Sequence, residues 1–172
     1  ESYKYHYKAA EAGDDTNVNI LDIDLLKLSV ERAFKNANLT LAAGRFPVSD
    51  STRMIYNQYS DGLYMKFALP TVTFGIYGGY TGLLNAQNIT IITPDKTSYN
   101  PDFTLSYVLA PKYIPFSLMI DFPVLFANQE LSVQAWGFAD VSDDAYNRFY
   151  ATASLSGPLA ANMYYSASRA FG

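Results

Sequence analysis

The chain has 172 residues, of which 49% are hydrophobic and only 16% are charged, a composition that excludes an intrinsically disordered protein. No apolar run approaches the roughly 20 residues that a membrane-spanning helix needs, so a helical membrane protein is excluded as well. With a net charge of −4 and no cysteine, we expect no nucleic-acid partner, no disulfide and no thiolate metal site.

In chain order, apolar and polar residues alternate in segment after segment, which is the pattern of β-strands with one apolar and one polar face. The pattern predicts strands at residues 3–8, 39–44, 63–69, 71–80, 116–122, 131–136, 148–155 and 161–168. Pro70 separates two of these segments and leaves room only for a tight connection, which indicates a hairpin. Residues 20–34 have both helical and alternating spacing, and the all-β context favours a strand there.

The expected connections alternate between short and long. Short links are predicted at 35–38, 69–71, 123–128 and 156–159, and long links at 10–16, 47–61, 81–112 and 141–147. Short turns at one rim and longer loops at the other are typical of outer-membrane barrels. This assignment places 102–109, which itself has strand character, within the long 81–112 link. If 102–109 crosses the membrane instead, every later turn lies on the opposite side of the membrane.

The two faces of the predicted strands differ in chemistry. In a transmembrane barrel the apolar face meets lipid and the polar face lines the lumen. The residues expected to face lipid are Leu63, Met65, Phe67, Val72, Phe74, Ile76, Leu118, Ile120 and Val133. The polar residues expected to face the lumen are Asp22, Asp24, Lys66, Asp121, Gln134, Arg148 and Asn162.

We therefore predict one domain over residues 1–172, an all-β, antiparallel, up-and-down transmembrane β-barrel with about 8–10 strands in this chain. The predicted barrel is either complete or part of a larger one. Strand number matters for function, because about eight strands give an interior filled by side chains, whereas 16 leave a channel.

A resemblance supports this prediction. Loop-adjacent motifs follow one another as GRFPVSD at 44–50, DGL at 61–63, GYTGLLN at 79–85, YVLAP at 107–111, FPVLF at 122–126, SGP at 156–158 and YY at 164–165. In this order they resemble poorly characterised spirochaete-type outer-membrane β-barrel proteins. The resemblance implies a location in the bacterial outer membrane and passive transport, and it assigns no functional residue. Members of that group are longer, which implies a partial barrel here.

Catalysis and metal binding are not expected. His6 is the only histidine, and no Gly-x-Ser-x-Gly motif accompanies it, so we predict that the chain is not an enzyme. Acidic residues at 14–15, 140 and 143–144 offer oxygen ligands for calcium but lack EF-hand spacing, so we expect neither a metal nor another cofactor. Arg45 and Arg53 flank a loop that holds Asp50 and Asp61, which indicates a salt-bridged loop.

The predicted function is a porin-like channel, or a structural membrane protein, with a polar lumen that passes small solutes; its partner is the lipid bilayer of the outer membrane, and self-association is left open. One alternative is a surface interaction or adhesion protein that uses the 81–112 loop. Another is a soluble lipocalin-like barrel that binds an apolar ligand inside an apolar interior.

Overall fold

The computed structural model describes residues 2–7, 17–22, 25–84, 109–141, 146–160 and 162–172, and every regular element in them is a strand. β1 (Ser2–Tyr7) and β2 (Asn17–Asp22) form a two-stranded antiparallel sheet of their own. The described residues contain no helix long and apolar enough to cross a bilayer.

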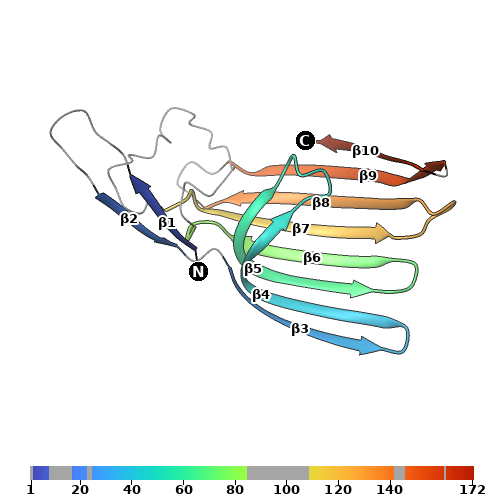
Figure 1. The fold of residues 1–172 in the computed structure, drawn as a ribbon, viewed down its shortest axis with the longest axis horizontal. Coiled ribbons are helices and arrows are strands. Elements are labelled where there is room, and N and C mark those ends of the chain that lie inside the picture. The colour runs from blue at the N-terminus through green and yellow to red at the C-terminus, as the bar shows by residue number, and fades with distance from the viewer. Residues whose placement is uncertain (1, 8–16, 23–24, 85–108, 142–145, 161) are drawn as a thin grey trace.

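The other strands form one eight-stranded antiparallel sheet in which neighbours in sequence are neighbours in space (Figure 1). They are β3 (Leu26–Phe34), β4 (Ala37–Ser49), β5 (Asn57–Ala68), β6 (Thr73–Tyr80), β7 (Tyr113–Phe122), β8 (Glu130–Asp140), β9 (Arg148–Ala160) and β10 (Met163–Phe171). The all-β, up-and-down prediction is confirmed. Of the segment 20–34, residues 26–34 form a strand as expected, whereas 20–22 belong to β2 of the separate sheet. The sheet is not closed, because β3 and β10 each have one neighbour among the described strands.

The predicted alternation between short and long connections holds only in part. Links of two to seven residues join β3 to β4, β5 to β6, β7 to β8 and β9 to β10 at one end of the sheet, the short-turn end (Figure 1). The links at the other end are 50–56, 81–112 and 141–147, of which only 81–112 is longer than the seven-residue β7–β8 link. Apart from Leu109, the segment 102–109 lies outside the described residues. β6 pairs directly with β7, so no described strand separates them.

Two predicted connections are wrong in their bounds. Residues 156–159 are part of β9, which continues to Ala160. Pro158 is tolerated there because β8 pairs with β9 only as far as Ser156, so no β8 acceptor needs its missing N–H. The 47–61 link narrows to residues 50–56, because β4 and β5 continue to pair with each other beyond the rest of the sheet.

The two faces of the sheet have opposite exposure. In β7, Tyr113, Pro115 and Ser117 are buried, whereas the alternating Ile114, Phe116 and Leu118 are exposed. The buried side chains belong to the polar face of the sheet, where an aromatic cluster gathers. Its members are Phe46, Tyr56, Tyr77, Tyr113, Trp136 and Phe138.

Candidate functional site

The apolar face is continuous across the sheet. Strand register places Phe67, Phe74, Ile120 and Val133 in one cross-strand row on this face. A second row joins Met65, Ile76 and Leu118, and Leu63 lies on the same face of β5. Val72 falls just before β6 and is half-buried. The residues predicted to face lipid are thus brought together on one side of the sheet, except for Val72, which lies in the preceding link.

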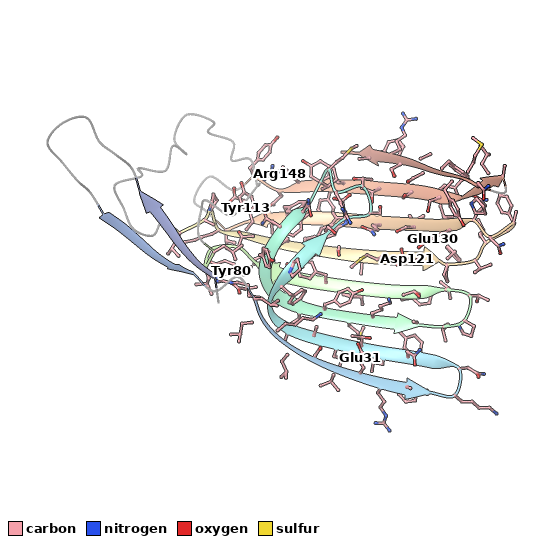
Figure 2. The ribbon with its side chains drawn as sticks, viewed as in Figure 1. Glu31, Tyr80, Tyr113, Asp121, Glu130 and Arg148 are labelled. Carbon is pink, nitrogen blue, oxygen red and sulfur yellow. The ribbon has the colours of Figure 1, made fainter. Side chains whose placement is uncertain are left out.

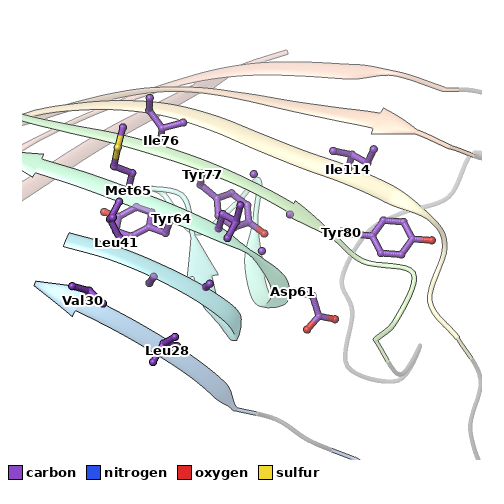
Figure 3. Close-up of a pocket in the computed structure, with 16 residues that line it drawn as sticks. Leu28, Val30, Leu41, Asp61, Tyr64, Met65, Ile76, Tyr77, Tyr80 and Ile114 are labelled. Carbon is purple, nitrogen blue, oxygen red and sulfur yellow. The ribbon is translucent and has the colours of Figure 1, made fainter. Parts of the chain in front are cut away.

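An apolar groove of about 840 Å³ runs along this face over β3 to β7 (Figure 3). Leu28, Val30, Leu41, Met65 and Ile76 line it. Small residues deepen the groove, because Ala43 and Gly78 supply little or no side chain where their neighbours supply leucine or methionine.

Four of the seven residues predicted to line the lumen share the opposite face. Lys66, Gly75, Met119 and Gln134 lie opposite one another on β5 to β8, so Lys66 and Gln134 are in the same cross-strand row. Asp121 on β7 lies opposite Ser132 on β8. Arg148 lies opposite Phe138, two residues beyond Trp136 on the same side of β8. Asp121 and Glu130 lie towards the short-turn end of the sheet, and Arg148 and Tyr113 towards the other end (Figure 2).

Three predicted lumen residues are not part of this set. Asn162 lies in the β9–β10 turn and not within a strand, because β10 begins only at Met163. Asp22 belongs to β2, in the separate two-stranded sheet. Asp24 lies outside the described residues.

A chain of hydrogen bonds runs along the polar face of β8. Ser132 Oγ donates to Asp121 Oδ1 over 2.6 Å, and Gln134 Nε2 donates to Ser132 Oγ over 3.2 Å. The indole Nε1 of Trp136 donates to Gln134 Oε1 over 3.0 Å. These bonds fix the side chains of alternate residues in one strand, so the polar face presents an ordered surface.

The end of the β4–β5 hairpin folds over this surface, and a row of glycines marks where it leaves the sheet. Gly44, Gly62 and Gly79 lie opposite one another on β4, β5 and β6. Gly44 has φ +117°, and a Cβ there would lie 2.0 Å from the carbonyl oxygen of Leu26. A side chain at Gly44 is therefore excluded both by the backbone conformation and by the neighbouring strand.

An ion pair braces the same bend. Arg45 and Asp61 are direct cross-strand partners next to the glycines, and their side chains meet in two hydrogen bonds of 2.9 and 2.7 Å. The Arg45 guanidinium also donates to the backbone oxygen of Leu83 over 3.1 Å, which ties the hairpin to the segment after β6. The salt bridge expected from the sequence is confirmed for this pair.

Asp50 organises the tip of the hairpin. Its buried carboxylate accepts hydrogen bonds from the backbone N–H groups of Thr52, Ile55 and Tyr56, at 2.8, 3.0 and 2.8 Å. The hydroxyl of Thr52 donates to the same carboxylate. Because one side chain satisfies several loop amides, residues 50–56 (hereafter the tip loop) hold a defined shape.

The tip loop rests on β8 and β9. The N–H of Ser51 donates to Gln134 Oε1 over 3.0 Å, and the Ser51 and Thr152 hydroxyl oxygens lie 3.3 Å apart. The Tyr56 ring stacks on Trp136 with centroids 5.2 Å apart.

Sequence reasoning placed Asp50 in a salt-bridged loop. It missed the contact of the tip loop with β8 and β9, which involves Tyr56, Trp136 and Thr152. The available signal was the pair Gly44 and Gly62, since two glycines near the ends of neighbouring strands allow a sharp departure from the sheet. The hydrogen bonds of this contact join residues that are 83 and 101 positions apart in the chain. The alternation of apolar and polar residues along a strand carries no information about such distant contacts.

Arg148 sits among aromatic rings at the long-loop end of the sheet. Its guanidinium lies 5.2 Å from the Tyr113 ring centroid and 5.9 Å from those of Phe138 and Tyr146. Aromatic rings attract a cation that lies over their faces, so these rings hold the Arg148 guanidinium in place. Arg148 therefore acts as a fixed positive group near this rim (Figure 2).

No group of three metal-ligating side chains occurs in the described part of the chain. Residues 14–15 and 143–144, two of the acidic groups considered for calcium, lie outside it. His6 lies in β1 opposite Val18, in the separate sheet. Comparisons of the chain with protein families, with curated proteins and with solved structures find no match. The resemblance to spirochaete-type outer-membrane proteins stays a prediction.

Proposed function

We propose that this chain forms the wall, or part of the wall, of an outer-membrane β-barrel whose polar side lines a path for small hydrophilic solutes. The observation that carries the proposal is the exposed apolar face. Each of the eight strands contributes a large apolar side chain that is at least 43% exposed, and all of them lie on one face: Leu28, Leu41, Leu63, Ile76, Leu118, Val133, Phe149 and Phe171.

A face of this kind is unfavourable in water. Soluble monomers rarely leave contiguous apolar patches larger than a few hundred Å² uncovered. Contact with the hydrocarbon of a bilayer removes the cost of exposing apolar side chains to water, and it does so for the whole face. The soluble lipocalin-like alternative needs this face turned into a closed interior, and the exposure of its side chains favours the membrane proposal.

The polar face supports the same proposal. Burial of Gln134, Thr152 and Ser60 with hydrogen-bond partners fits a hydrated lumen more readily than a hydrophobic core. The strand lengths of 8 to 13 residues also suit a tilted crossing of the bilayer, which takes about 9–11 residues.

The test is heat-modifiable electrophoretic mobility in detergent, combined with conductance in planar lipid bilayers. We expect folded protein to require detergent for solubility, to migrate faster unheated than boiled, and to produce discrete conductance steps. The boiled sample added to the same bilayer is the control. A protein that is soluble without detergent and shows one mobility before and after heating would contradict the proposal.

A further inference from the structure

We infer that the folded-over end of the β4–β5 hairpin, residues 46–60, is the constriction of the pore and sets the size limit for hydrophilic solutes. We call this segment the inner flap. The inference rests on the proposed function, because it concerns what limits passage along the polar face.

The first step is where the inner flap lies. Its tip loop contacts Gln134 on β8 and Thr152 on β9, although its own strands are β4 and β5 (Figure 1). Neighbouring strands are about 4.8 Å apart, so the flap reaches about 14 Å across the polar face from β5 to β8. It therefore crosses the surface that would line the lumen.

The second step is what the inner flap covers. Tyr77, Ser117 and Trp136 form one cross-strand row on the polar face of β6, β7 and β8. All three are at most 1% exposed, although they lie on the face proposed to meet water. Tyr56 of the flap stacks on Trp136 and lies 6.4 Å, centroid to centroid, from Tyr77. The flap therefore fills space next to these three residues that would otherwise be open to solutes.

The third step is that the inner flap is held in place by its own fixed contacts. Asp50 fixes the shape of the tip loop, the glycine row fixes the bend, and the Arg45–Asp61 pair braces the base. At the tip, the stacked rings and the Ser51 hydrogen bond attach it to β8. An element attached at both ends behaves as a permanent narrowing, and its removal widens the path.

The pairing of β4 with β5 shows where the inner flap can be cut out of the chain. Arg45 and Asp61 are direct partners, so residues 46–60 can be replaced by an Asn-Gly turn that joins them as a two-residue hairpin. We expect this trimmed variant to keep its heat-modifiable mobility and its place in the bilayer. We expect its single-channel conductance to rise several-fold and its size cutoff in liposome swelling with neutral sugars to increase.

A disulfide tests the position of the inner flap in the membrane, and the chain has no native cysteine to interfere. In the S51C/T152C variant the two side chains replace hydroxyls 3.3 Å apart. We expect this disulfide to form in folded, bilayer-inserted protein and to leave conductance at or below the wild-type value. The control is S154C/S168C, which joins β9 to β10 at hydroxyls 3.0 Å apart and does not touch the flap.

The outcomes separate the two proposals. If the trimmed variant folds, inserts and conducts no more than wild type, the inner flap is not the constriction, while the membrane proposal stands. The inference also fails if the S51C/T152C bond does not form under conditions in which the control bond does. If neither wild type nor trimmed protein shows heat-modifiable mobility or inserts, the proposed function itself fails.

Discussion

At the scale of single residues, Asp50 shows how one side chain can shape a loop. Its carboxylate accepts from the amides of Thr52, Ile55 and Tyr56, and the backbone adds a bond from the Asp50 N–H to the Tyr56 oxygen at 2.9 Å. Without the carboxylate, buried amides such as that of Tyr56 would lose their acceptor. An unsatisfied buried group of this kind costs about 1–3 kcal/mol.

We predict that Asp50→Ala loosens the tip loop and lowers the free energy of unfolding by about 1–3 kcal/mol. Asp50→Asn should cost less, because its amide oxygen still accepts one hydrogen bond. The measurement is urea unfolding followed by the fluorescence of Trp136, on which the tip-loop residue Tyr56 stacks. Equal free energies of unfolding for wild type and the alanine variant would show that the carboxylate does not hold the loop.

At the scale of elements, strand β3 offers a test of which solvent each face meets. Ser29 and Val30 are consecutive, both are exposed, and they lie on the polar and apolar faces respectively. In water a lysine at either position is tolerated about equally. In a bilayer, a lysine on the lipid face near the midplane costs about 2–4 kcal/mol, whereas one on the lumen face costs little.

We therefore predict that Val30→Lys strongly reduces the fraction of protein that folds into lipid vesicles, and that Ser29→Lys leaves it near wild type. The heat-modifiable band on a gel measures the folded fraction. The two variants carry the same charge at adjacent positions, so each controls for the other. Equal folding yields would mean that the apolar face does not meet hydrocarbon.

The elements also show how much the sequence can predict. A strand with one apolar and one polar face repeats every two residues, and this local signal predicted β4 to β10 in outline. For β3 the spacing was ambiguous between helix and strand, and only the all-β context favoured a strand. Strand ends were less accurate, since Pro47 and Pro158 indicate turns locally but lie where β4 and β9 have a single partner strand. The inner flap could not be predicted, because it depends on contacts between residues far apart in the chain.

At the scale of the whole molecule, the two open edges of the sheet determine how many strands a closed wall would contain. The β3 edge strand and the β10 edge strand present unpaired backbone groups on one side each among the described strands. In hydrocarbon each unsatisfied N–H or C=O costs several kcal/mol, so membrane-spanning strands are found paired. Eight is an even number, so β3 and β10 run in opposite directions and suit an antiparallel pairing.

We predict that both edges are paired in the membrane. The measurement is disulfide trapping with paired cysteines on the two edge strands, for example E31C with S168C, both on the polar face. A cross-link within one chain indicates an eight-stranded barrel, in which the inner flap would fill the lumen. A cross-link between two chains indicates a wall of 16 strands, in which the same flap would narrow a channel. If no bond forms at any offset of the two positions along the strands, β3 does not pair with β10 of the same or a second copy. Removal of the flap should therefore open a filled lumen in the eight-stranded barrel, and it should widen an existing channel in the 16-stranded assembly.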